Sequence, residues 1–160
     1  MKKYFYVFFV VAIFVGSSCK KKEVFKNDKE AIIAVIEEET DAYRDSDYKR
    51  LAATNVKDKT NIRITAQKEG YVYLEGWDKI GLLLKRYLKR NMNYENMNQV
   101  KSNYKIKVYE GCAWAVFDDI IYGKGGDVKL KSIGTRFLEK KNGNWKIVYM
   151  SDVNTTSYSR

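Results

Sequence analysis

This 160-residue sequence contains no histidine. The side chains that could take part in a reaction are therefore the acids, the tyrosines and the two cysteines. The absence removes the commonest general base, the usual partner of a nucleophilic serine or cysteine and the commonest metal ligand. Acid–base chemistry would therefore need a carboxyl group whose pKa is raised by apolar surroundings. The candidates are Glu75, Asp118 and Asp152. None of them lies in a catalytic motif, so no catalytic residue is assigned.

Charged residues also occur within the segments that we expect to be strands. Asp118 and Asp119 are adjacent near the end of one expected strand, and we expect this pair to be solvated. Arg136 is a lone cation inside another expected strand, between small and apolar neighbours. It could hold an anionic ligand or pair with an acid on a neighbouring strand, and we favour the ion pair.

The sequence predicts no metal site and no cofactor. The two cysteines, Cys19 and Cys112, lie far apart, and no group of carboxylates has the spacing of a calcium loop. Cys112 lies in an apolar strand pattern, where a free cysteine behaves as a small hydrophobic residue.

Residues 1–18 have the layout of a secretory signal peptide, which is removed from the mature protein. Two lysines are followed by an apolar run over residues 4–15 and then by three small residues. The apolar run is shorter than the ~20 residues that a membrane-spanning helix needs, and Lys20–Lys22 end it.

The stretch VGSSC, which ends at Cys19, resembles the lipobox of bacterial lipoproteins. The resemblance implies cleavage before Cys19, acylation of its thiol and new amino group, and a tether over residues 19–27. It also implies a location in the bacterial cell envelope, on the periplasmic or outer face of a membrane. Several acyl chains give stable anchoring, since each buried methylene contributes ~0.8 kcal/mol. The alternative is a secreted protein with a chance cysteine at position 19.

The formal charge of the whole sequence is +10, and cleavage before Cys19 would remove two of its lysines. A basic balance can indicate nucleic acid or an anionic membrane surface as a partner. Lysines and arginines are scattered along the chain, and the cluster over residues 85–90 is typical of a solvated helix face. Because an exported lipoprotein seldom meets nucleic acid, we expect the membrane and no nucleic acid as a partner.

Helical patterns come before strand patterns along residues 28–160. A capping box at Asn27 predicts a helix over 28–44, Asp47 predicts a second short helix, and a third is expected from Trp77. Two short extended segments precede the third helix, and period-two alternation with an Asn-Gly turn then predicts four strands. The expected strand segments are 60–67, 71–74, 103–110, 112–121, 128–140 and 145–153. This order indicates one α+β domain, with helices on one face of a curved antiparallel sheet.

The order of elements resembles the cone-shaped nuclear transport factor 2-like (NTF2-like) superfamily, in its SnoaL-like branch. The motifs that carry the resemblance are AIIAVIEEETDAYRDSDYKRL, EGWDKI, AWAVF and the terminal RFLEKKNGNWKIVYMSDVNTTSY. It implies a conical pocket between the helices and the concave sheet. Members include isomerases, cyclases, dehydratases, ligand binders and dimerising modules, so the fold alone does not give the function.

The resemblance places several aromatic residues at the expected pocket. Tyr43 and Tyr73 lie near the contact between helices and sheet, where each could hold a ligand or cover the core edge. Trp77 could border the pocket mouth or pack its helix on the sheet. Trp114 would line the cavity if its face of the sheet points inward, and would lie in an interface if it points to a partner. The expected pocket residues are Tyr43, Tyr73, Trp77, Trp114, Arg136 and Asp152.

The sequence therefore predicts a membrane-anchored lipoprotein whose SnoaL-like domain binds a small amphipathic ligand or an envelope protein without catalysis. One alternative is an enzyme, an isomerase or hydrolase that uses Asp152 or Glu75 with a tyrosine. Another is an interaction module that forms a homodimer through the open face of the sheet.

Overall fold

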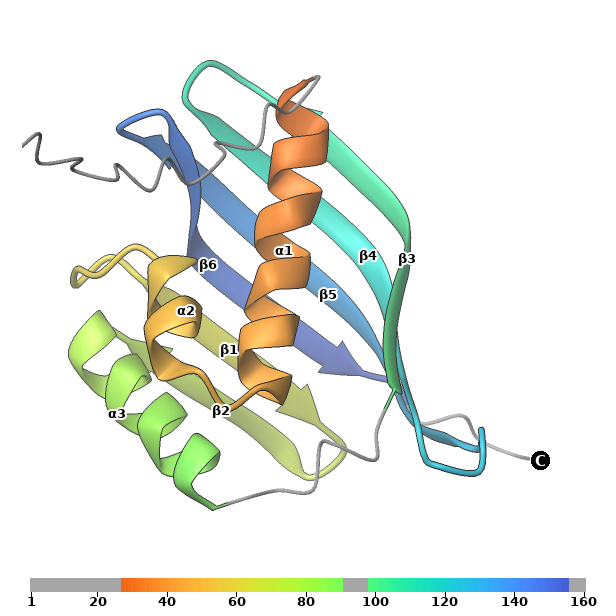
Figure 1. Cartoon of the computed structure of the whole chain (residues 1–160). Helices are drawn as coiled ribbons and strands as arrows, with labels where there is room; N and C mark the ends of the chain where they lie inside the picture. Colours follow the sequence, from red (N-terminus) through yellow and green to blue (C-terminus); the bar gives the residue numbers. More distant parts are fainter. Residues whose placement is uncertain (1–26, 91–97, 156–160) are drawn as a thin grey trace, which may run out of the picture.

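The computed structural model describes residues 27–90 and 98–155 (Figure 1). Its helices are α1 (Asp28–Arg44), α2 (Tyr48–Ala53) and α3 (Trp77–Lys89), and they lie on one face of a six-stranded sheet. This arrangement confirms the α+β fold expected from the sequence. The signal peptide, the lipobox cysteine Cys19 and the tether, except Asn27, fall outside the described residues. None of the helices within the described ranges is long and apolar enough to cross a membrane.

The two helix caps expected from the sequence are present. The side-chain oxygen of Asn27 accepts a hydrogen bond from the main-chain N–H of Glu30 at 3.1 Å, and Asp47 accepts one from Arg50 at 3.0 Å. These bonds satisfy main-chain donors that the first turn of a helix leaves unpaired. From its cap onward, α1 buries Ile32 and Ile36 completely against the sheet.

The sheet joins all the strands of the described chain in the order β2-β1-β6-β5-β4-β3. Neighbouring strands are antiparallel except β1 and β6, which run parallel. This pairing places the short β1–β2 hairpin beside the last strand, where α3 covers it (Figure 1). The strands are β1 (Ile62–Gln67), β2 (Gly70–Glu75), β3 (Asn98–Val108), β4 (Cys112–Tyr122), β5 (Val128–Lys141) and β6 (Asn144–Asn154).

Side chains alternate between the two faces of the sheet along each long strand. The inner face, which points to the helices, buries Phe117, Leu138 and Ile147 together with Ile32 and Ile36 of α1. The outer face carries no helix, as Figure 1 shows for the described part of the chain. Register shifts in the β3–β4 and β5–β6 pairs mark irregular positions of the kind that bends a strand. The helices therefore face a curved sheet along one side only.

Candidate functional site

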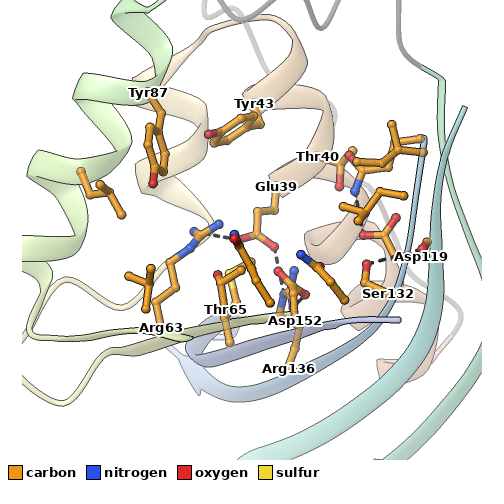
Figure 2. Close-up of a pocket in the computed structure, with 18 of the residues that line it drawn as sticks. Glu39, Thr40, Tyr43, Arg63, Thr65, Tyr87, Asp119, Ser132, Arg136 and Asp152 are labelled. Atoms are coloured by element: carbon orange, nitrogen blue, oxygen red, sulfur yellow. Dashed lines mark hydrogen bonds and ion pairs between the residues drawn. The ribbon is translucent and has the colours of Figure 1, made fainter. Parts of the chain in front are cut away.

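A cavity of about 370 Å³ lies between the helices and the inner face of the sheet (Figure 2). Its polar lining comes from α1 and from the inner positions of β1, β3, β4, β5 and β6. Its apolar lining comes mainly from β2, α3, the last turn-side residues of β4 and the first residues of β5. The charged members of the lining are Glu39, Arg63, Asp119, Arg136 and Asp152. The aliphatic members are Val72, Leu74, Leu83, Ile121, Leu130 and Met150. The cavity thus combines a charged base with apolar walls.

Arg136 on β5 lies at the centre of the charged base and is only 3 % exposed. Its Nε donates to Oε2 of Glu39 at 3.0 Å, and its Nη1 donates to Oδ1 of Asp152 at 2.8 Å. Burial alone would lower the pKa of Arg136, but the two carboxylates outweigh burial and raise it. Arg136 is therefore a buried cation held by acids from α1 and β6, which confirms the expected ion pair with a neighbouring strand.

Glu39 reaches the cavity from the middle of α1 and is 5 % exposed. While its Oε2 accepts from Arg136, its Oε1 has no hydrogen-bond partner among the described residues. Nη1 of Arg63 on β1 lies 4.0 Å from this oxygen, which is too long for a hydrogen bond. Glu39 is not among the pocket residues expected from the sequence. Its signal is the helical spacing of this acid with the buried Ile32 and Ile36.

Asp119 on β4 is also buried, so the expectation that the Asp118–Asp119 pair is solvated is wrong for Asp119. The cause is alternation along β4, which turns Asp119 inward and Asp118 to the outer face. Oδ2 of Asp119 accepts from Nε2 of Gln99 at 2.7 Å, whereas Oδ1 has no partner among the described residues. Burial raises the pKa of Asp119, and Lys101 and the bond from Gln99 oppose this shift.

The structure brings three of the expected pocket residues together and places three elsewhere. Tyr43, Arg136 and Asp152 line the cavity. Figure 2 shows the Tyr43 ring above the charged base, beside Tyr87 of α3.

The other three expected residues do not line the cavity, and the element that carries each one explains why. Tyr73 points to the outer side of the β1–β2 hairpin, is 48 % exposed and donates to Glu75 at 3.0 Å. Trp77 packs α3 against the apolar cluster around Leu84. Trp114 lies on the outer face because its neighbours Ala113 and Ala115 are the buried residues of β4.

The remaining chemical candidates also lie away from the cavity. Glu75 is exposed at the end of β2, and Cys112 is half-buried on the outer face of β4. Within residues 27–90 and 98–155, no three acids or cysteines are grouped closely enough to hold a metal ion. The chemistry available in the described chain is therefore that of the charged base, where carboxylates can accept hydrogen bonds or carry a proton.

Comparisons with known proteins bear on the fold. No protein-family profile matches the sequence, and no curated protein sequence matches it. Solved structures do match. A protein of unknown function with a cystatin-like fold from Nostoc punctiforme is 14 % identical, with a TM-score of 0.68 over 86 % of this chain and 98 % of its own. The described domain has the NTF2-like, or cystatin-like, fold.

Two further structural neighbours place the same NTF2-like fold in other bacteria. An NTF2-like protein from Novosphingobium aromaticivorans is 14 % identical, with a TM-score of 0.68 over 82 % of this chain and 84 % of its own. A protein from Streptomyces avermitilis, described as a candidate dehydratase of the NTF2-like family, is 13 % identical, with a TM-score of 0.67 over 81 % of this chain and 97 % of its own. At these identities the likeness concerns the fold alone.

Proposed function

We propose that this protein is a membrane-anchored lipoprotein of the bacterial envelope whose NTF2-like domain binds a small amphipathic ligand without catalysis. The observation that carries the proposal is the cavity of about 370 Å³, which has a charged base and apolar walls. Ligand pockets typically measure about 300–1,000 Å³ and combine apolar walls with a few polar groups that orient the ligand. An amphipathic molecule matches both parts of this lining.

Filling the cavity tests ligand binding. Thr65 lines the cavity on β1, so Thr65→Phe should occupy the space that the ligand needs. The control is Thr135→Phe, which places the same ring on the outer face of β5. The full chain would be purified from bacterial membranes and extracted with organic solvent, and the released small molecules compared by mass spectrometry. We expect one molecule from the unmodified chain and the control, and none from Thr65→Phe. Equal release from all three would contradict the proposal.

The anchor is tested separately at Cys19. We expect the N-terminal peptide of the exported protein to begin at this cysteine and to carry the mass of acyl chains. The Cys19→Ser variant should then leave the membrane fraction. An unmodified thiol at residue 19 would show that the lipobox assignment is wrong, and it would leave the ligand-binding proposal untouched.

Catalysis is the second candidate function, and the buried Asp119 favours it. A carboxyl group with a raised pKa and an unpartnered oxygen, placed in a cavity, has the properties of a proton shuttle. It is a better candidate than Glu75, which is exposed, or Asp152, which pairs with Arg136. The test is deuterium exchange from heavy water into the bound molecule. Exchange that Asp119→Asn abolishes and Asp118→Asn preserves would establish an enzyme.

The outer face of the sheet supports a homodimer as a third proposal. Large apolar side chains are exposed there on both edges and in the centre, and Phe137 lies directly opposite Trp114 in the β4–β5 register. A second copy of the sheet would cover these side chains and remove their apolar surface from water. Sedimentation of the full chain in detergent should show a dimer that Phe137→Glu dissociates. A monomer at high protein concentration would contradict this assembly.

A further inference from the structure

Two buried carboxyl oxygens at the base of the cavity accept no hydrogen bond within the described chain. They are Oε1 of Glu39 and Oδ1 of Asp119, and each residue is 5 % exposed. Most buried polar atoms in proteins are paired, because an unpaired one destabilises the folded state. The two atoms come from α1 and β4, and both residues line the same cavity. Their shared location points to a ligand that completes both hydrogen bonds.

The first of these oxygens faces a cation that does not reach it. Oε1 of Glu39 stands 4.0 Å from Nη1 of Arg63, so a ligand group at this oxygen also lies close to the guanidinium. That ligand group must accept from the guanidinium and donate to the carboxylate. A hydroxyl does both. An ammonium group only donates and is repelled by Arg63, and a carboxylate only accepts and is repelled by Glu39.

The second oxygen has the same mixed surroundings. Asp119 lies directly opposite Lys101 in the β3–β4 register, and the ammonium of Lys101 donates to Oγ1 of Thr40 rather than to Asp119. Gln99 donates to the other oxygen of Asp119. A hydroxyl placed here donates to Oδ1 of Asp119 and can accept from Lys101. Both orphan oxygens therefore favour the same ligand group.

The charge of the base favours a ligand without net charge. Three acids, Glu39, Asp119 and Asp152, and two cations, Arg63 and Arg136, line the cavity. Lys101 does not line it but acts on the charge of Asp119, so acids and cations are equal in number once this lysine is included. A charged ligand head would upset this balance in a buried site, where unpaired charge is costly. The apolar walls on α3 and β2 fit the rest of an amphipathic molecule.

We propose that the cavity selects a neutral amphiphile whose head carries two hydroxyl groups, one bound by Glu39 and one by Asp119. The inference rests on the proposed ligand-binding function and adds the chemical class of the ligand. A glycerol-type lipid and an alkyl glycoside both supply this chemistry.

The test compares small probes that share a six-carbon chain and differ in the head. They are 1,2-hexanediol, hexyl glucoside, 1-hexanol, hexylamine and hexanoate. The full chain would be held in phosphatidylcholine vesicles, and binding measured by saturation-transfer NMR with irradiation of aromatic protons. The rings of Tyr43 and Tyr87 line the cavity, and phosphatidylcholine has no aromatic protons, so the signal comes from the protein.

Two probes, 1,2-hexanediol and hexyl glucoside, carry more than one hydroxyl group. We expect at least one of them to bind about tenfold more tightly than 1-hexanol, since one good hydrogen bond to a charged group is worth about this factor. Preference for the diol would indicate a glycerol-type source, and preference for the glucoside a glycoside. Equal binding of 1-hexanol would overturn the ligand class while ligand binding itself stood. Tightest binding of hexylamine or hexanoate would overturn it as well. Absence of binding by every probe would overturn both this inference and the proposed function.

A matched pair of variants tests the assignment to Asp119. Asp119→Asn keeps an acceptor for Gln99 and removes the charged acceptor from the cavity, so the preference for the hydroxylated probe should shrink several-fold. Asp118→Asn makes the same change on the outer face, where Asp118 accepts from Asn103, and should leave the preference intact. An unchanged preference in Asp119→Asn would remove Asp119 from the site.

Discussion

The two halves of the sheet's inner face differ in chemistry, although the same strands build both. One half, the closed end, packs against the first half of α1 without polar side chains at its centre. Its largest fully buried members are Ile32, Ile36, Phe117, Leu138 and Ile147. The other half, the open end, holds the cavity and its charged residues Glu39, Asp119, Arg136 and Asp152. Residues two positions apart on β4 or β5 point to the same face of the sheet, so one can lie in the closed end and the next in the open end.

Along a single strand, the residues that stabilise the fold are therefore separate from the residues that line the cavity. The boundary runs through Phe117, whose ring stacks with that of Tyr104 and also lies 5.3 Å from the guanidinium of Arg136. Apolar burial at the closed end supplies the hydrophobic contribution to folding. The open end instead contains buried charge, which is weak evidence for stability and stronger evidence for function.

Truncation at the closed end should have the largest effect on stability. Phe117→Ala should lower the free energy of unfolding by about 3–5 kcal/mol, because it leaves a cavity in a filled core. The matched change at the open end is Leu83→Ala, which should cost much less, since Leu83 already borders empty space. Urea unfolding of both variants measures the difference. Equal losses would mean that the two halves are packed alike.

Removing the central cation should cost almost as much at the open end. Arg136→Met leaves the buried Glu39 and the half-buried Asp152 without their partner, and breaking a buried pair typically costs about 3–5 kcal/mol. Replacing Glu39, Arg136 and Asp152 together by apolar residues should recover most of the loss in urea unfolding, because no unpaired charge is left. If the single variant were as stable as the unmodified protein, the charge cluster would have no structural part.

A smaller loss of stability is expected at the point where the ring of Phe117 lies against β5. A Cβ atom added at Gly134 would lie 2.5 Å from Cε2 of Phe117, so Gly134→Ala overpacks the boundary between the two halves. Such overpacking costs about 1–3 kcal/mol. Trimming the ring in the double variant Gly134→Ala/Phe117→Leu should make the alanine less costly than it is beside phenylalanine. If the losses of stability from the two substitutions were simply additive in urea unfolding, the added Cβ atom would not be strained against the phenylalanine ring.

The smallest expected effect is a pH dependence at Asp119. Burial raises its pKa, so the folded state binds the proton more tightly than the unfolded state. The contribution of Asp119 to stability is then complete below about pH 4 and is lost as pH rises through the raised pKa. Asp119→Asn, which does not titrate, should therefore gain stability relative to the unmodified protein as pH rises from about 4 to 7.

The urea concentration at the midpoint of unfolding, measured across this pH range, tests the direction of this change in stability. Asp118→Asn is the control, because that side chain lies on the outer face and bonds to Asn103. Parallel curves for the unmodified protein and Asp119→Asn would show that the buried carboxyl group is not linked to folding.

Local signals in the sequence were enough to predict the elements of the fold. The caps at Asn27 and Asp47 and the Asn142–Gly143 turn act over a few residues, and the structure contains all three. The parallel pairing of β1 with β6 could not be read in the same way. Alternation identifies a strand, but it does not name a partner far along the chain, as the pairing of Ile62 with Tyr149 requires.

The site was harder to predict than the fold because both faces of β4 carry apolar residues. Trp114 and Val116 look as suitable for a core as Ala113 and Ala115, and only the packing of α1 on the small alanines decides which face is inside. The same choice of face decides whether Asp118 or Asp119 is buried. Glu39 and Arg136 lie 97 residues apart, so their pairing also depends on the tertiary fold.

The most direct test of the open end as a binding site is a crystal structure of the protein purified from its own membrane. We expect electron density for a bound molecule between Glu39 and Asp119, with its apolar part along α3. A space between helices and sheet that is filled by the protein's own side chains, with Arg63 and Lys101 bonded directly to these two acids, would contradict it.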